Sequence, residues 1–302
     1  MKIASILHQG AEVASIVTDG GFLPIPSITR RFNQNWPDDL YNILVEEKLE
    51  QIKFWFYQNC ASLTKEIEEL SLPKKGIHFA PLYRRPRKIW GIGLNYKAHA
   101  EDLSEKTPTS EPASFLKPDT TIIGFNDSIK IPLLSEKTTG EAELGLIFGK
   151  KCKNVNREDW HSVIAGFTAI IDMTAEDILR RNPRNLTQSK SFDTFFSFGP
   201  ILYTIDEVKD LSGLKVQTIV NGKMVAQNTV ANMTFPPDLL VSYHSQIMTM
   251  LPGDIISTGT PGAAPLKNGD LIECRINGYQ PLINKVIDMK LLDEANNNHL
   301  IR

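Results

Sequence analysis

Hydrophobic residues are spaced differently in a short leading part of the chain and in a longer second part. Residues 2–7 and 11–17 are rich in apolar and β-branched side chains, which predicts two strands. Between 38 and 70, apolar residues recur every three or four positions, which predicts two helices, with an aspartate at 38 or 39 as the first cap. A connector rich in proline and basic residues then leads into the second part.

Short runs of β-forming residues dominate the second part. Strands are expected over residues 122–131, 141–148, 167–171, 216–220, 224–226, 255–256 and 271–276. Asn221-Gly222 lies between two of them, as a type I′ hairpin turn requires. Helices are expected near residues 157–165, 174–181 and 237–250. The pattern predicts an α+β protein, mostly β, with a small N-terminal α/β domain over 1–82 and a larger domain over 83–302.

Composition and charge narrow the class of protein. Of 302 residues, 41% are hydrophobic and 23% are charged, which is typical of a globular protein. The net charge is −2, so no basic excess favours a nucleic-acid partner. No apolar run approaches the ~18 residues of a membrane helix, and no cleavable signal is recognisable, so no membrane association is expected. The cysteines at 60, 152 and 274 are far apart, which indicates free thiols and a cytoplasmic protein.

Glu141 and Glu143 are the first candidates for chemistry. They stand two apart in a predicted strand, so both carboxylates lie on one face; taken alone, the pair is better explained by a solvated face. Asp172 ends an apolar run, where a buried carboxylate is costly unless it is paired or bound to a metal. Three carboxylates without a nearby His or Cys suit Mg²⁺ or Mn²⁺, with Ca²⁺ as an alternative.

Lys190 and His99 are further candidates. Lys190 lies among small and aromatic residues, where it is either a surface side chain or a positive donor for developing charge. His99 is followed by Glu101 and Asp102, and could form with one of them a pair for general acid–base work; a solvated histidine is the alternative.

Two glycine-containing segments could approach a ligand. Gly91 and Gly93 superficially match a dinucleotide fingerprint, but Tyr96 stands where its third glycine would be, so NAD is not expected. The segment 257–262 follows an apolar strand and could aim backbone N–H groups at an anion, although many ordinary loops share this sequence pattern.

In order along the chain, several of these segments resemble the fumarylacetoacetate hydrolase family. The similarity covers roughly residues 88–290, with the family's approximate spacing. The matching motifs are GIGLNYKAH (91–99), FLKP (115–118), EAELGLIFGK (141–150), IAGFTAIIDMTAED (164–177), SKSFDTFFSFGP (189–200), VNGK (220–223) and LPGDIISTGTPG (251–262). The agreement of several separate motifs makes the resemblance specific.

The resemblance implies a mixed β-roll or barrel-like catalytic domain, commonly in a homodimer. It implies that Glu141, Glu143 and Asp172 hold the cation. It also implies catalytic roles for His99, Asp102 and Lys190, with His99 on a segment that orders over the ligand. Substrate contacts are implied for Tyr96, Gly259 and Thr260.

Members of this family cleave or rearrange small oxo-acids. The resemblance therefore implies a hydrolase or lyase that breaks a C–C bond in a 2-oxo acid or 1,3-dicarbonyl compound through a metal-stabilised enolate, similar to acylpyruvate hydrolase or oxaloacetate decarboxylase. The alternatives are an isomerase or dehydratase of a sugar-derived acid, and a weakly catalytic homologue that binds a metabolite or protein.

The sequence departs from the family pattern at Glu176, where members usually carry an arginine that contacts a substrate carboxylate. A glutamate there would repel a second carboxylate, which predicts a neutral or hydroxylated substrate tail. Arg180, Arg181 and Arg184 are the nearby arginines that could reach the same space.

Overall fold

The computed structural model describes residues 1–102 and 108–293. The leading part comprises β1 (Lys2–His8), β2 (Ala11–Val17), β3 (Phe22–Pro24), α1 (Ile25–Arg31), α2 (Leu40–Val45), α3 (Leu49–Asn59) and α4 (Thr64–Leu70). Asp39 caps α2, since its side chain accepts a hydrogen bond from the Asn42 backbone N–H at 3.0 Å. The helical segment holds three helices rather than the predicted two, because the chain turns at Glu47, whose φ is 53°.

The second part carries most of the strands. Its elements are β4 (Ile89–Gly93), α5 (Lys97–Asp102), β5 (Ala113–Lys117), β6 (Ile122–Ile123), β7 (Ser128–Ile131), β8 (Thr138–Phe148), β9 (Ile164–Ala175), α6 (Glu176–Arg181), α7 (Leu186–Lys190), β10 (Phe196–Thr204), β11 (Lys215–Val220), β12 (Lys223–Thr229), α8 (Pro237–Ile247), β13 (Ile255–Ser257), β14 (Ala263–Pro265), β15 (Leu271–Ile276) and β16 (Leu282–Asp288). No helix among the described residues is long and apolar enough to cross a membrane.

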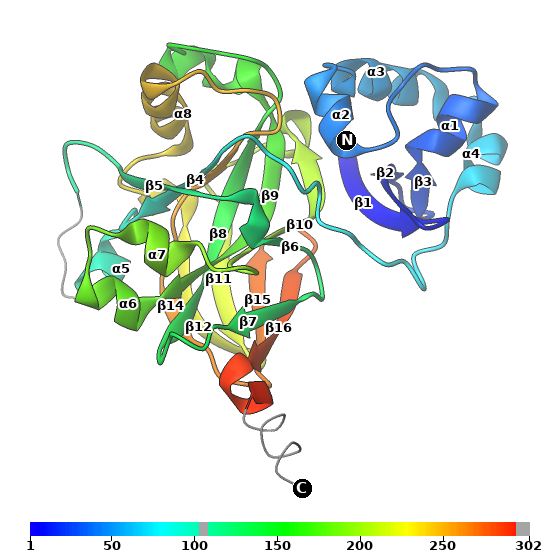
Figure 1. Cartoon of the computed structure of the whole chain (residues 1–302). Helices are drawn as coiled ribbons and strands as arrows, with labels where there is room; N and C mark the ends of the chain where they lie inside the picture. Colours follow the sequence, from blue (N-terminus) through cyan, green and yellow to red (C-terminus); the bar gives the residue numbers. More distant parts are fainter. Residues whose placement is uncertain (103–107, 294–302) are drawn as a thin grey trace, which may run out of the picture.

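Two sheets organise these strands. The larger has the order β3-β2-β1-β10-β9-β8-β13-β4-β5, with β14 beside β8 and β6 beside β10; the smaller has the order β12-β11-β15-β16-β7. Each order has two ends, so neither sheet closes into a barrel. The result confirms the predicted α+β fold rich in strands. Because β1 pairs with β10, the larger sheet joins the leading and second parts (Figure 1), and the predicted boundary at residue 82 stays a prediction.

The central strands β8 and β9 separate two hydrophobic cores, and every residue of both strands is buried. One face of β8, with Ala142 and Leu144, packs into a core that includes Ile272 of the smaller sheet. Further along β8, the opposite face contributes Ile147 to the core beneath the N-terminal helices. The carboxylates of Glu141 and Glu143 lie on this opposite face, because side chains alternate along a strand. The cluster therefore shares a face of β8 with Ile147, which belongs to the N-terminal core.

Local predictions succeeded where the sequence signal was strong. Asn221 and Gly222 have φ values of 51° and 76° and join β11 to β12, as the predicted hairpin requires. The helix expected near residues 157–165 is a 3₁₀ helix, Arg157–Val163, after which β9 begins at once. β10 and α7 were not predicted.

Candidate active site

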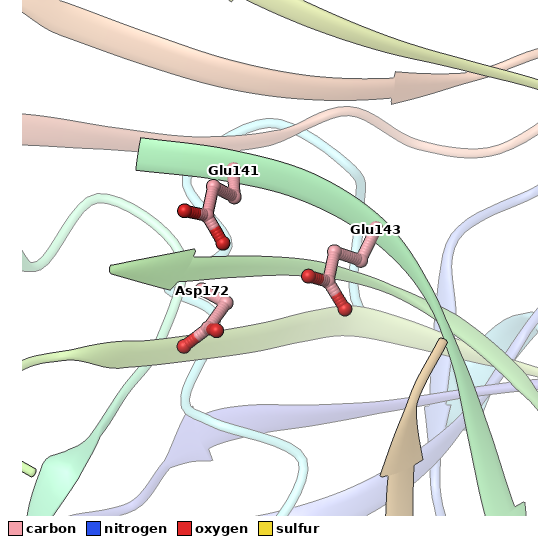
Figure 2. A group of neighbouring side chains, drawn as sticks. All are labelled: Glu141, Glu143 and Asp172. Carbon is pink, nitrogen blue, oxygen red and sulfur yellow. The ribbon is translucent and has the colours of Figure 1, made fainter. Parts of the chain in front are cut away.

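Glu141, Glu143 and Asp172 form one buried cluster. Glu141 stands directly opposite Asp172 in the antiparallel pair β8 and β9, so their side chains lie on the same face of the sheet. Carboxylate oxygens of all three residues lie within 4.8 Å of one another. Figure 2 shows the carboxylates of the two neighbouring strands turned into a shared space. The structure thus brings the three predicted ligands together, and their binding of a metal stays a prediction.

Two lysines reach the cluster from outside the two strands. The Lys190 Nζ, at the end of α7, lies 2.6 Å from Asp172 Oδ2 and 3.0 Å from Glu141 Oε2. The Lys117 Nζ, at the end of β5, lies 2.5 Å from Asp172 Oδ1. Lys117 was not predicted as a site residue, although it is the lysine of the FLKP motif. Asp172 is thus held between two buried ammonium groups.

Hydroxyl and backbone donors orient the glutamates. The Thr174 Oγ1 donates to Glu141 Oε1 at 2.8 Å. Glu143 Oε2 accepts from the Ser257 Oγ at 2.5 Å and from the Gly259 N–H at 2.8 Å. Gly259 has a φ of +95°, and a Cβ there would lie 2.8 Å from that of Asn95, so both the backbone and the packing require glycine.

Burial and charge shift the pKa values within the cluster. Burial disfavours the charged form of Asp172, but Lys117 and Lys190 outweigh it and hold the pKa of this carboxyl below its ordinary value. Burial, together with the charges of Asp172 and Glu141, raises the pKa of Glu143 to about 8. Burial lowers the pKa of Lys117 to about 8, whereas the three carboxylates outweigh burial and raise the pKa of Lys190.

The cluster has the composition of a site for a hard divalent cation. Its possible ligands are carboxylate oxygens from three residues, and oxygen ligands suit Mg²⁺, Mn²⁺ and Ca²⁺. Two ammonium groups leave the three carboxylates with an excess of negative charge when all are ionised. Burial, and then the charges of Asp172 and Glu141, raise the pKa of Glu143, and a bound cation would favour its ionised form. The residues present therefore fit the cation.

A cavity of about 430 Å³ adjoins the cluster. Glu141 and Lys190 line it together with His99 and Thr260. The remaining lining residues are Ile92, Gly93, Leu94, Ala113, Phe115, Thr139, Thr174, Glu176, Leu179, Arg180, Pro183, Leu186 and Ala263. His99 is 6% exposed in α5, so it lies in the site rather than on a solvated surface. The cavity brings three of the predicted catalytic and substrate-binding residues beside a carboxylate of the cluster.

The other predicted residues are placed differently. Tyr96 is fully buried, its hydroxyl has no hydrogen-bond partner among the described residues, and it is not among the residues that line the cavity. Gly259 contacts Glu143 rather than the cavity. Asp102 ends α5, but its side chain lies outside the described part of the chain. The roles of these three residues stay predictions.

Glu176 is not the unpaired negative charge that the sequence suggested. Its Oε2 lies 2.8 Å from the Lys137 Nζ, and its Oε1 lies 2.6 Å from the Nη2 of Arg180. The premise that a bare carboxylate here repels a second substrate carboxylate is therefore wrong. Of the three arginines that could reach this space, Arg180 lines the cavity.

Comparison with known proteins agrees with this architecture. The family model described as the C-terminal part of fumarylacetoacetate hydrolase matches residues 88–287. The chain belongs to the fumarylacetoacetate hydrolase family. A family member from Rattus norvegicus, the mitochondrial oxaloacetate tautomerase Fahd2a, is 35% identical over 72% of this chain and 71% of its own length.

Solved structures of the family share the fold over most of the chain. The 5-carboxymethyl-2-hydroxymuconate delta-isomerase of Mycobacterium smegmatis has a TM-score of 0.74 at 27% identity, covering 95% of this chain and 99% of its own. The maleylpyruvate hydrolase of Sphingobium sp. SYK-6, in complex with manganese(II) ion and pyruvate, has a TM-score of 0.75 at 25% identity, with the same two coverages. Enzymes with hydrolase, isomerase and tautomerase names thus share this architecture.

Proposed function

We propose that this protein is a divalent-metal-dependent enzyme that acts on a small 2-oxo acid or 1,3-dicarbonyl compound. One observation carries the proposal: the buried cluster of Glu141, Glu143 and Asp172 lies beside a cavity of about 430 Å³ that Lys190 also lines. The complex of the Sphingobium hydrolase with manganese(II) ion and pyruvate supports both the kind of cation and the class of substrate.

The cation, when bound by the three carboxylates, would supply a Lewis acid for the oxygens of the oxo-acid. Lys190 would add a positive donor to the same end of the cavity. Its Nζ is held between Asp172 and Glu141 and lies 4.8 Å from the centre of the Phe115 ring, so its position is restricted on several sides. A charge fixed in this way stabilises developing negative charge without reorganisation.

His99 is the group best placed to move a proton. It is buried, it lines the cavity, and an imidazole can accept or donate a proton near neutral pH. Thr260, which lines the same cavity, would contact a substrate oxygen. These residues would together remove or deliver a proton at the carbon beside the keto group.

We favour cleavage of a C–C bond as the complete reaction, similar to acylpyruvate hydrolysis or oxaloacetate decarboxylation. The hydrolase name of the Sphingobium protein supports this assignment. Tautomerisation or isomerisation is the second candidate, and the names of the rat relative and the mycobacterial protein favour it. Both candidates share proton transfer beside the keto group and differ in whether a C–C bond breaks. The cytoplasmic location and the homodimer stay predictions.

The test separates proton transfer from bond cleavage. Pyruvate, oxaloacetate and an acylpyruvate are incubated with the protein and Mg²⁺ in D₂O, and proton NMR follows both deuterium uptake beside the keto group and the products. Metal-dependent uptake that is absent from Glu141→Ala/Glu143→Ala supports the proposal. Cleavage products identify a hydrolase or lyase, and uptake alone identifies a tautomerase. A protein that turns over no acid with Mg²⁺ or Mn²⁺ would be the weakly catalytic homologue instead.

A further inference from the structure

The segment that carries His99 begins with a sharp bend. β4 ends at Gly93, and Leu94 follows with a φ of 54°, a left-handed backbone conformation that a leucine rarely adopts. The bend turns the chain from β4 into α5, where His99 lies. Gly93, Leu94 and His99 all line the cavity. A backbone conformation of this kind persists only where its surroundings fix it, so the contacts of the next residue, Asn95, decide how the segment is held.

Asn95 is fully buried and ties the segment to two other parts of the chain. Its Nδ2 donates to the Thr258 carbonyl oxygen at 2.7 Å and to the Phe235 carbonyl oxygen at 3.0 Å, and its Oδ1 accepts from the Phe235 N–H at 2.8 Å. The Asn95 carbonyl oxygen also accepts from the Thr234 N–H at 2.8 Å. Both amide donors and the amide oxygen are therefore used, and neither an aspartate nor a leucine of the same size offers this set of donors and acceptor.

The loop on the other side of Asn95 belongs to the carboxylate cluster. Thr258 precedes Gly259, whose N–H donates to Glu143 Oε2 at 2.8 Å. The backbone of Gly259 passes so close that a Cβ there would lie 2.8 Å from the Asn95 Cβ. Thr258 is also bonded to β8, because its N–H and its Oγ1 donate to the Leu144 carbonyl oxygen at 3.1 and 2.9 Å. The loop is thus fixed to the strand of Glu143, and Asn95 fastens the bend after β4 to that loop.

We propose that Asn95 is a positioning residue that fixes His99 relative to the carboxylate cluster. Asn95 is not among the residues that line the cavity, so it acts on the reaction only through the groups that it holds. His99 follows it by four residues, about one helical turn, and a shift of Asn95 is passed on through this short stretch of backbone. A misplacement of about 1 Å can lower a rate by about 10²-fold. This proposal rests on the proposed function, in which His99 moves a proton.

The first test measures the metal-dependent reaction of Asn95→Ala. We expect kcat to fall by about 10- to 100-fold, because His99 loses its fixed position. The Kd for Mn²⁺ should change by less than about threefold, since the bonds to Leu144 still hold the loop; losing a group that contacts a metal ligand directly typically weakens binding by about 10- to 100-fold. Asn232→Ala is the control and should retain both values, because Asn232 is exposed and its Nδ2 donates to Asn228.

A double variant separates positioning from a general loss of structure. If Asn95 acts through His99, the kcat of Asn95→Ala/His99→Ala should equal that of His99→Ala within about twofold, because the positioned group is already gone. Two independent effects would multiply instead, and this result would overturn the proposal. An unchanged kcat in Asn95→Ala would overturn it as well, while the proposed function stands. Asn95→Asp keeps the shape and one acceptor oxygen but loses the amide donors, and it replaces Asn95→Ala in every measurement if that variant does not fold.

A chemical probe covers a protein that turns over no acid, a result that would defeat the proposed function. Diethyl pyrocarbonate modifies imidazoles, and mass spectrometry gives the rate at each histidine. His99 is 6% exposed, so in Asn95→Ala it should react at least about fivefold faster than in the wild type, because the freed segment opens more often. The exposed His161 should react at the wild-type rate and is the internal control. Equal rates at His99 in the two proteins would overturn the proposal.

Discussion

The carboxylate cluster and the wall that Glu176, Leu179 and Arg180 of α6 form in the same cavity are built in different ways. Glu141 and Asp172 lie opposite each other in a fully buried strand pair, so the backbone register sets the distance between them. Glu176 and Arg180 lie on a helix of six residues, where an ion pair between side chains holds the arrangement. Isolated helices this short are not stable, so the wall depends on its contacts. The strand pair therefore fixes the carboxylates through the backbone, whereas the wall is held by contacts between side chains.

This difference predicts that changes in the cluster have larger effects on function and stability than changes in the ion pairs of the wall. The largest effect is expected for Glu141→Ala/Glu143→Ala. At a Mn²⁺ concentration of about 100 times Kd, the wild type should gain about 2.7 kcal/mol of stability, and the variant should gain none. Thermal denaturation with and without Mn²⁺ measures this gain. The exposed Glu158→Ala should behave as wild type, and a full metal-induced shift in the double variant would contradict the metal assignment.

Lys190→Met removes the positive donor and retains much of the side-chain length. We expect kcat to fall by about 10²–10³-fold, because a preorganised charge at the reacting group is lost. The metal-free variant should also lose about 3 kcal/mol of stability, since Asp172 and Glu141 lose a buried partner. Steady-state kinetics and denaturant unfolding measure these two effects. Lys223→Met, at an exposed position of β12, is the control. A variant with wild-type kcat would assign Lys190 to stability alone.

His99→Ala tests whether His99, which lies in α5 and lines the cavity, takes part in proton transfer. We expect kcat to fall by about 10²-fold, because the proton-transfer group is lost, while Mn²⁺ affinity remains near that of the wild type. The reason is that His99 lines the cavity but is not one of the three clustered carboxylates. Kinetics and calorimetric Mn²⁺ titration together distinguish the two effects. An unchanged rate would exclude His99 from proton transfer.

The smallest expected effect concerns the stability that the wall ion pairs provide. Burial disfavours the charged form of Glu176, but Lys137 and Arg180 outweigh it and hold its pKa below the ordinary value. The stabilisation is therefore present above the unfolded-state pKa of about 4.3 and is lost as the pH falls through the lower folded-state pKa. The free energy of unfolding of the wild type should exceed that of Glu176→Gln by about 1 kcal/mol at neutral pH. The difference is small because the side chains of Lys137 and Arg180 are exposed to solvent. Urea unfolding across the acid range should show this difference disappear, and a difference independent of pH would contradict the ion-pair explanation.

The sequence by itself determined the features that depend on local pattern. The spacing of two places Glu141 and Glu143 on one face of any strand, and Asn221-Gly222 can adopt the two positive φ values that its hairpin needs. Asp39 caps its helix through a residue three positions away. The end of the apolar run marked Asp172 as a buried carboxylate. Neighbouring residues made Lys190 and His99 candidates, and the family motifs supplied their catalytic roles.

Only the tertiary structure decided which distant groups meet. Lys117 reaches Asp172 from 55 positions away, and Lys137 neutralises Glu176 from 39 positions away. β10 lies between β1 and β9, so its pairing depends on the order of the whole sheet. Sheet order and register are set by burial of complete strand faces and not by short stretches of sequence. For this reason the sequence marked Asp172 as a buried carboxylate, and only the folded chain showed that Glu141 and Glu143 are buried beside it and which cations pair with them.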